Sequence, residues 1–368
     1  MSTTILEKPI PLENYLPPLD SKIAVCMSGG VDSSTSAYIL KQKGYEVIGL
    51  TGWLIKGSGR CCDNGMVDAA KVSEQIGINH ISKDLRVFFK QEIVDPFINS
   101  YSIGSTPIPC ITCNTTIKWG SLMQYAFNEL GSTHIATGHY AKLVLDGNTY
   151  KITRPKDKRK DQTYMLWGLT QDVLSKTVFP LGDLTKEEVR EIAKSGDLSI
   201  ADKEESQDIC FVSDKEGTQG FLGKYLQSRE GSIVENKTGK VIGTHEGTHN
   251  FTIGQRKGLR IAHSEPLYVV SLDVENNIVY AGTKDELEGY ELIARDVNWI
   301  VPVKTRLIAS VQAKIRYNSK TSPAKIELLE NNHVRVTFNE PQSAITPGQA
   351  CVFYDESDQI LLGGGWIC

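Results

Sequence analysis

The chain has 368 residues, enough for two or three domains that each bury a core of their own. Its 40 Lys and Arg residues against 44 Asp and Glu residues give a net charge of −4, so a polyanionic partner must be met by local basic patches rather than by an overall basic field. Apolar runs stay short of membrane-spanning length and residues 1–20 lack the pattern of a signal peptide, so we expect a flexible lead-in and a cytoplasmic protein with no membrane contact.

The sequence S-G-G-V-D-S at residues 28–33 joins an apolar run of strand length, residues 23–27, to a helical pattern at residues 33–43. Gly29 and Gly30 let the backbone approach a ligand closely, and the N-terminus of the helix favours an anion. The loop is not a Walker A motif, because the lysine that reaches the outer phosphates is absent. We therefore expect a phosphate site for a reaction in which pyrophosphate leaves as a unit. An ordinary glycine turn is the alternative.

Strands and helices alternate over roughly the first half of the chain, which predicts a doubly wound parallel α/β sheet. Ligands bind such sheets at the carboxyl ends of the strands, where residues 28–33 and 137–140 both lie. We expect these two segments to face one nucleotide, with His139 either catalytic or ordering its loop. Beyond the first unit, the expected strands are residues 46–51, 78–81 and 134–138, and the expected helices are residues 66–76, 87–101 and 114–130.

The second half of the chain changes character. The charge run R-P-K-D-K-R-K-D-Q at residues 154–162 is by itself typical of a solvated surface, and Thr185 and Glu188 form a capping-box pattern on an amphipathic helix at residues 184–196. In residues 231–254, glycine and charged residues alternate with short strands in a linker-like segment. The expected divisions are a lead-in at 1–20, an α/β domain at 21–212, a central linker domain at 213–288, and a small closed β-barrel at 289–368, where short alternating strands follow one another.

The eight cysteines do not suggest a secreted disulfide framework. We expect Cys26, Cys351 and Cys368 to be packing residues. Cys61 and Cys62 receive no role, because adjacent cysteines cannot easily chelate one metal.

Three other cysteines carry a chemical signal. Cys110 and Cys113 form C-x-x-C, and we expect Cys113 to precede directly a helix begun by Asn114, where the helix dipole lowers a thiol pKa. Cys210 lies far along the chain in S-Q-D-I-C-F-V. The C-x-x-C alone is compatible with zinc, an iron–sulfur cluster, redox chemistry or no function, although zinc would require four ligands.

The loop S-G-G-V-D-S resembles the pyrophosphatase loop of the N-type ATP pyrophosphatases, which adenylate a carbonyl oxygen. From about residue 22 to residue 366, the chain resembles one family of this superfamily, the bacterial tRNA-specific 2-thiouridylases. The motifs that carry the resemblance are M-S-G-G-V-D-S-S, P-C-x-x-C-N-x-x-I-K-W, I-A-T-G-H-Y, K-D-Q-T-Y-M-L, F-P-L-G-D-L-T-K-x-E-V-R, S-Q-D-I-C-F-V and F-T-I-G-Q-R-K-G-L. The family fold is a pyrophosphatase domain, a small linker domain and a C-terminal β-barrel.

The resemblance implies that ATP, bound together with Mg²⁺, adenylates O2 of the wobble uridine in tRNAs for Lys, Glu and Gln. A cysteine desulfurase or a sulfur relay would load a persulfide onto Cys210. Cys113 would be the nucleophile that releases the sulfur, leaving a Cys113–Cys210 disulfide. Cys110, where the family varies between Asp and Cys, could join both thiols around a [4Fe–4S] cluster. We favour the metal-free route, because no fourth ligand is visible.

The same resemblance assigns binding residues. Gly52 and Gly138 would lie near the adenine, although Gly52 departs from the larger apolar residue usual in the family. The implied contacts are Met27, Ser28, Gly29, Gly30, Val31, Asp32 and Ser33 for ATP; Ile108, Pro109 and Cys110 for the target base; and Lys160, Asp161, Gln162, Arg316 and Tyr317 for tRNA.

Two other functions compete with tRNA thiolation: that of a synthetase that adenylates a small molecule, and that of a non-catalytic RNA-binding relative.

Overall fold

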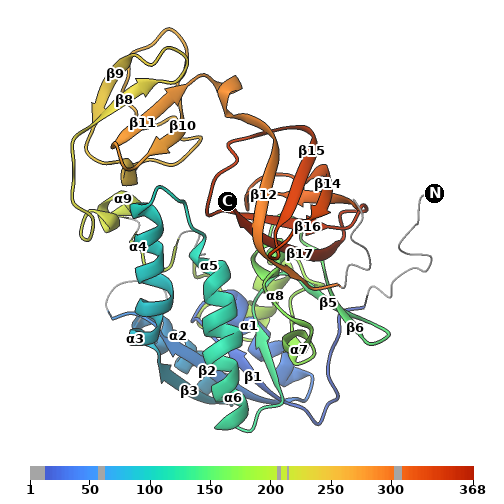
Figure 1. Ribbon diagram of the computed structural model, residues 1–368. Helices are drawn as coiled ribbons and strands as arrows, with labels where there is room; N and C mark the ends of the chain where they lie inside the picture. Colours follow the sequence, from blue (N-terminus) through green and yellow to red (C-terminus); the bar gives the residue numbers. More distant parts are fainter. Residues whose placement is uncertain (1–12, 57–62, 205–208, 214, 302–308) are drawn as a thin grey trace, which may run out of the picture.

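The computed structural model describes residues 13–56, 63–204, 209–213, 215–301 and 309–368. They form a parallel sheet with its helices, a four-stranded sheet and a barrel, which lie at the bottom, upper left and right of Figure 1. The predicted parallel α/β sheet and the predicted closed barrel are both confirmed. Cys61 and Cys62 lie outside the described residues, as does most of the expected lead-in.

The first sheet has five parallel strands in the order β3-β2-β1-β4-β7. The strands are β1 (Lys22–Cys26), β2 (Glu46–Trp53), β3 (Asn79–Asp84), β4 (His134–Thr137) and β7 (Thr177–Val178). The helices are α1 (Val31–Gln42), α2 (Asp63–Gln75), α3 (Arg86–Phe89), α4 (Asp95–Ser102), α5 (Pro109–Thr112), α6 (Met123–Asn128), α7 (Gln171–Leu174) and α8 (Lys186–Ser195).

The central strand β1 is covered on both faces, which explains its continuous apolar sequence. Ile23 and Val25 pack in one cluster with residues of α1, α2 and α8. Ala24 and Cys26 point to the other face, into a cluster with residues of α4 and α6. That second cluster continues into the barrel through Ala350, Val352 and Tyr354, so the two domains share a core.

Two predicted helices contain π-helical segments, at Lys90–Val94 between α3 and α4 and at Cys113–Leu122 between α5 and α6. The second of these helices begins at Pro109 rather than Asn114. Proline favours the first helical position because its fixed φ suits the helix and its missing N–H needs no partner there. The prediction that Cys113 stands directly before a helix is therefore wrong.

A short helix and the four-stranded sheet make up the middle of the chain. In the sheet β11 and β8 are parallel, while both outer strands are antiparallel to their neighbours. Residues 231–254, predicted to hold short strands in a linker-like segment, contribute two of its strands, so the predicted strands are confirmed. The elements are α9 (Gly217–Leu222), β8 (Gly231–Glu235), β9 (Val241–His245), β10 (Tyr268–Asp273) and β11 (Ile278–Gly282), and the strands follow the order β10-β11-β8-β9.

The barrel strands are β12 (Glu288–Trp299), β13 (Ala309–Lys314), β14 (Ser322–Leu328), β15 (Val334–Ser343), β16 (Ala350–Tyr354) and β17 (Ile360–Ile367). They are antiparallel, and pairing of β12 with β17 closes the barrel. A hairpin from the first half of the chain, β5 (Lys142–Asp146) and β6 (Thr149–Thr153), adds to β17 through the pairs Ile360–Thr153 and Leu361–Ile152. No helix in the described ranges is long and apolar enough to cross a membrane.

Candidate active site

The loop between β1 and α1 is held in a conformation that only glycine allows at one position. Gly29 has φ +71°, and a Cβ there would lie 2.2 Å from the carbonyl oxygen of Gly65. Gly138, at the end of β4, presses on the same loop, since a Cβ on it would lie 2.6 Å from the Ser33 nitrogen. The two predicted nucleotide segments are therefore in direct contact at the carboxyl edge of the sheet.

Two hydroxyl groups organise the loop. The backbone N–H of Ser28 donates to Oγ of Ser33 at 3.1 Å, and the two Oγ atoms lie 3.3 Å apart. Gly30 is the extended N-cap of α1 and has no side chain to occupy the free N–H groups of the first turn. Ser28 is exposed. This arrangement fits an anionic ligand above the helix.

Asp32 lies in the first turn of α1 and has two partners from distant segments. Lys186 Nζ donates to Asp32 Oδ1 at 2.6 Å, and the Tyr140 hydroxyl donates to the same oxygen at 2.9 Å. A second lysine, Lys203, donates from Nζ to the Gly29 carbonyl oxygen at 2.8 Å. The loop has no lysine of its own, and these two cations could not be predicted from its sequence because neither lies within 150 residues of it.

His139 is buried and orders its surroundings. Its ring stacks on Trp119 with centroids 5.5 Å apart, and its Nδ1 lies 2.8 Å from Oγ1 of Thr137. Burial, and next the positive charge of Lys118, holds the pKa of His139 well below the usual 6.5. Lys118 Nζ lies 3.5 Å from His139 Nε2. The neutral ring therefore accepts from Lys118. This contact favours the prediction that His139 orders its loop over the prediction that it is catalytic.

Residues 108–110, predicted to lie against the target base and called the base-side segment below, begin the helix that carries Cys113. Ile108 is the N-cap and is buried, Pro109 is buried at the first helical position, and Cys110 is exposed in the first turn. Cys113 is partly buried and starts the π-helical segment. Asn114 is 2% exposed and donates from Nδ2 to the Met165 carbonyl oxygen at 2.9 Å, which fixes the helix beside Cys113. Such π-helical segments are frequent at functional sites.

Cys210 is followed by Phe211, whose ring packs into a group of aromatic side chains. The ring of Phe211 packs edge-to-face against Phe97 with centroids 5.1 Å apart, and against Phe89 at 5.9 Å. Cys113 and Cys210 are both partly buried against the one large hydrophobic cluster that underlies this face. Two thiols from distant segments therefore border one core.

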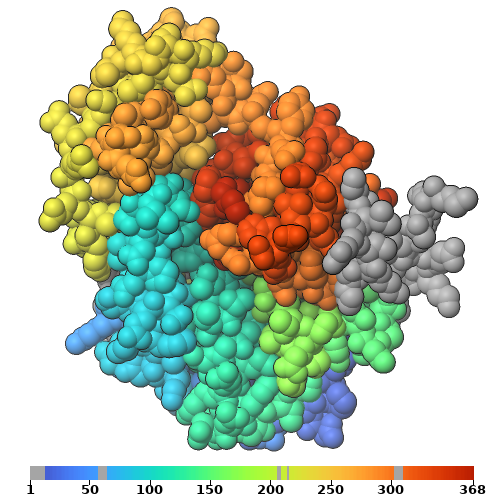
Figure 2. Space-filling view, in the orientation of Figure 1, coloured from blue at the N-terminus to red at the C-terminus, as the bar shows by residue number. Residues whose placement is uncertain are grey.

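The segment before α5 is held by other parts of the chain. The Thr106 N–H donates to the Pro347 carbonyl oxygen at 2.9 Å, and Gln349 Nε2 donates to the Thr106 carbonyl oxygen at 2.8 Å. Gly348 has φ +87°, and a Cβ on it would lie 2.2 Å from Ser105 Oγ. The barrel thus fixes the entry to the helix of Cys110 and Cys113. Figure 2 shows α4, the middle sheet and the barrel around a recess on this side.

Two of the predicted tRNA-binding residues, Asp161 and Tyr317, line a groove of about 510 Å³ between the charge run and the barrel. Its walls carry five cationic side chains against two carboxylates. Tyr317 lies in it, and burial raises the pKa of this phenol, with further contributions from Asp161 and Cys110. The groove therefore adjoins the base-side segment. The lining residues are Arg154, Lys158, Arg159, Asp161, Lys314, Tyr317, Asn318, Ser319, Lys320, Thr321, Asp358 and Gln359.

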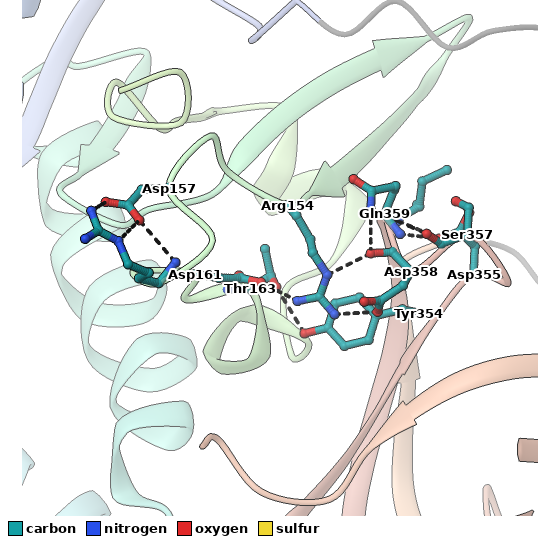
Figure 3. Close-up of polar contacts among 11 residues, drawn as sticks. Arg154, Asp157, Asp161, Thr163, Tyr354, Asp355, Ser357, Asp358 and Gln359 are labelled. Carbon is teal, nitrogen blue, oxygen red and sulfur yellow. Dashed lines mark hydrogen bonds and ion pairs between the residues drawn. The ribbon is translucent and has the colours of Figure 1, made fainter. Parts of the chain in front are cut away.

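Several predicted tRNA contacts also have structural partners (Figure 3). Asp161 is 8% exposed and accepts from Arg154 Nη1 and from the Thr163 N–H, the latter at 2.8 Å. Gln162 Oε1 accepts from the Tyr140 N–H at 3.0 Å, and Arg316 Nη2 donates to a barrel carbonyl oxygen at 2.9 Å. Two exposed lysines also line the groove. Lys158 belongs to the charge run, which the family resemblance makes an expected RNA contact, whereas Lys320 was not predicted.

The remaining residues behave as follows. Burial raises the pKa of Cys26 to about 12, and Cys351 is also fully enclosed, so both are packing residues as predicted. Cys368 is exposed, so the same prediction is wrong for it.

Gly52 lies near the end of β2, where a Cβ would meet the side-chain ends of Leu54, Leu122 and Leu85 at 3.2 to 3.6 Å. Among the described residues, no group of three or more His, Cys, Asp or Glu side chains is placed to hold a metal ion.

Three family models match consecutive parts of the chain. They are described as a tRNA methyl transferase HUP domain, a tRNA methyl transferase PRC-barrel domain and an aminomethyltransferase beta-barrel domain, and they match residues 21–214, 219–283 and 290–367.

Curated relatives match over nearly their whole length. A protein of Nostoc punctiforme named tRNA-specific 2-thiouridylase MnmA is 49% identical over 348 residues, which cover 94% of this chain and 98% of the relative. One of Rippkaea orientalis with the same name is 47% identical, covering 94% and 99%. Among solved structures, the U34-tRNA thiolase NcsA from Methanococcus maripaludis with its [4Fe-4S] cluster has a TM-score of 0.35 and 20% identity, covering 53% of this chain and 62% of that one. A likeness this slight carries no argument about chemistry.

Proposed function

The chain belongs to the family of tRNA-specific 2-thiouridylases, and we propose that it uses ATP to replace O2 of the wobble uridine of tRNA by sulfur. One observation carries the proposal beyond the family name. The glycine loop at the carboxyl edge of the sheet has Lys186 beside it, two partly buried thiols border one core, and a basic groove lies between the charge run and the barrel. Each is required by one part of the reaction: activation of the base, delivery of sulfur and binding of RNA.

The first step activates the base. Met27 to Ser33 would bind ATP, with Gly138 supporting the loop and Gly52 toward the adenine. O2 of uracil attacks the α-phosphate, pyrophosphate leaves, and the O2–AMP ester makes C2 electrophilic. Asp32 is 32% exposed and supplies a carboxylate oxygen of the kind that Mg²⁺ prefers, so it would hold the ion that accompanies ATP.

The second step transfers sulfur. The terminal sulfur of a Cys210 persulfide attacks C2 and AMP leaves with the former O2. The Cys113 thiolate then attacks Sγ of Cys210, and the electron pair of the broken S–S bond forms the thiocarbonyl at C2. The product is a Cys113–Cys210 disulfide, which an external thiol must reduce before the next turnover.

The groove and the base-side segment would hold the RNA. An unpaired anticodon base can leave its stack and be bound beside Ile108, Pro109 and Cys110, because single-stranded bases are accessible on all edges. Lys160 and the loop at Arg316 and Tyr317 would contact the backbone from either side. We assign catalysis to residues 21–212, connection to residues 213–288 and RNA docking to residues 289–368.

The finer assignments follow the family. The substrates would be tRNAs for Lys, Glu and Gln, the sulfur donor a cysteine desulfurase or relay protein, and the compartment the cytoplasm. We propose the metal-free route rather than a cluster on Cys110, Cys113 and Cys210. Anaerobic purification with iron and sulfide analysis tests this choice. Bound iron that Cys110→Ala loses, together with sulfide-dependent activity, would contradict it.

The experiment for the whole proposal is nucleoside mass analysis after incubation of tRNA with protein, Mg-ATP, a cysteine desulfurase with cysteine as the persulfide source, and a thiol reductant. We expect 2-thiouridine and one pyrophosphate per thiolated base. A small-molecule synthetase would release pyrophosphate without tRNA, and a non-catalytic RNA-binding protein would retain tRNA without cleaving ATP. The family-model descriptions contain the words methyl transferase, so methylated uridine is measured in the same digest. Its appearance in place of 2-thiouridine would overturn the proposal.

A further inference from the structure

Lys186 brings a buried ammonium group to the phosphate loop from a distant helix. Its Nζ donates to Asp32 Oδ1 at 2.6 Å, and 7% of its side chain is exposed, against 32% for Asp32. The loop itself contains no lysine between Met27 and Ser34. A positive charge of the kind that phosphate loops often carry within their own sequence is therefore supplied here from α8, beside that of Lys203.

The start of α8 is built to hold this side chain in place. Thr185 and Glu188 form a capping box, confirming the sequence prediction, and Oδ2 of Asp157 accepts from the Lys186 N–H at 3.1 Å. The N-terminal N–H groups of α8 thus have protein acceptors. Val189 and Ala193 fix the helix in the same hydrophobic cluster as residues of α1. The Lys186 side chain remains the positive group that α8 presents to the loop.

We propose that Lys186 releases Asp32 when ATP binds and then contacts the β- and γ-phosphates of ATP. After adenylation it would contact the departing pyrophosphate. The proposal rests on the assignment of ATP to this loop. In the nucleotide-free protein each charge neutralises the other. When Mg-ATP binds, the partly exposed Asp32 turns to the metal and Lys186 forms charge-assisted hydrogen bonds to phosphate oxygens. Neither state leaves a buried charge without a partner, which would be costly.

A purely structural role for Lys186, in which it only neutralises Asp32, makes a different prediction. In that case Lys186→Met has no effect once Asp32→Asn has removed the carboxylate charge. If Lys186 binds phosphate itself, its loss weakens anion binding in both backgrounds. Asp32→Asn alone should then bind pyrophosphate at least as tightly as the wild type when Mg²⁺ is absent, because a repelling charge is gone and Lys186 is released.

The test measures the affinity of inorganic pyrophosphate by calorimetry, with EDTA and again with Mg²⁺, for wild type, Lys186→Met, Asp32→Asn and the double variant. We expect Lys186→Met to weaken binding at least about tenfold in both backgrounds, as for loss of a charged hydrogen bond. Lys186→Arg, which keeps the charge, should retain most of the affinity. Lys194→Met, at the far end of α8 with a side chain 59% exposed, is the matched control and should change nothing.

Each result decides the role of Lys186. Equal affinity in Lys186→Met and wild type overturns the proposal, and so does a loss that disappears in the Asp32→Asn background. If Lys186→Met is unstable, Lys186→Arg with an unchanged melting temperature separates binding from folding. The proposal then stands only if Lys186→Arg binds pyrophosphate at least tenfold more tightly than heat-denatured protein does. If wild type binds neither ATP nor pyrophosphate with Mg²⁺, the proposed function itself fails.

Discussion

Arg154 Nη2 lies 2.5 Å from Oδ1 of Asp358, so an ion pair joins the β5–β6 hairpin to the turn between β16 and β17 of the barrel. Arg154 is 10% exposed, also pairs with the buried Asp161, and lies over the Tyr354 ring at 4.0 Å from its centroid. Figure 3 shows Arg154 between these partners. The groove proposed for tRNA therefore has one wall from each domain, held together beneath its surface.

The first prediction concerns this junction. Arg154→Ala leaves the buried Asp161 without its cation, so we expect the free energy of unfolding to fall by about 3–5 kcal/mol. Asp358→Asn removes a carboxylate that is 38% exposed, and we expect a loss within about 1 kcal/mol. Urea unfolding of both variants checks the difference. Equal losses would show that the Arg154–Asp161 pair is not the main link.

The second prediction separates the two thiols from the other cysteines. Cys113→Ala and Cys210→Ala should each abolish 2-thiouridine formation while tRNA binding stays within about twofold, since neither side chain is needed to fill the core. Cys368→Ala, which changes an exposed thiol at the end of the barrel, is the control and should be fully active. Activity of either of the first two variants with a cysteine desulfurase as the persulfide donor would contradict the assigned roles.

The third prediction concerns the groove. Lys158→Gln and Lys320→Gln should each weaken tRNA binding and reduce the slope of log affinity against log salt by about one unit, because one phosphate contact is lost. ATP affinity should not change. Lys43→Gln removes an exposed lysine after the C-terminal end of α1, at the opposite edge of the sheet, and is the matched control. Slopes that match that of Lys43→Gln would place the RNA elsewhere.

The order of the elements could be predicted because their signals are local. Strand β1, the glycine loop and the alternating strands of the barrel depend on patterns of a few residues. The β5–β6 hairpin was not predicted, because its strands follow the His139 loop directly and one of them runs into the charge run. What stabilises β6 at the domain junction is its pairing with β17, more than 200 residues away.

The site was predicted only in part for the same reason. The loop and the reactive cysteines lie in recognisable motifs, whereas the cations beside the loop depend on tertiary packing. Lys186 was treated as one residue of an amphipathic helix, since nothing in its sequence neighbourhood indicates a carboxylate partner at residue 32. Asp157 was likewise only part of a charge run and Asp161 was assigned to tRNA, yet both carboxylates are nearly buried and hold structural contacts.

The fourth prediction uses pH. The pKa of His139 lies well below 6.5 in the folded protein because of burial and then Lys118, whereas the unfolded chain titrates near the usual value. As pH falls below about 6.5, the unfolded chain binds a proton that the folded site does not, so stability decreases by up to about 1.4 kcal/mol per pH unit.

His139→Gln should remove this part of the pH dependence. We expect its free energy of unfolding to fall less steeply than that of wild type between pH 6.5 and pH 5, although the variant is less stable at pH 7.5. His80, His134, His245 and His249 also have lowered pKa values, so a residual slope remains in both proteins. Identical slopes, measured by urea unfolding across this range, would mean that His139 is protonated in the folded state.

The last prediction compares two glycines assigned to the nucleotide. A Cβ on Gly138 would lie 2.6 Å from the Ser33 nitrogen and 2.8 Å from the Asp32 carbonyl carbon, so Gly138→Ala must displace the backbone of the loop. We expect ATP affinity to fall at least about tenfold, with a loss of stability of about 1–3 kcal/mol from overpacking. tRNA affinity, measured in parallel, should be unchanged.

Gly52→Ala is the matched variant, because its added methyl would meet only the flexible ends of leucine side chains, none closer than 3.2 Å. These side chains can shift by a few tenths of an ångström, so ATP affinity should stay within about twofold of wild type. Calorimetric titration with ATP compares the two variants under one condition. If Gly52→Ala weakens ATP binding as strongly as Gly138→Ala, the adenine must lie directly on β2, where it would depend on the missing side chain for space.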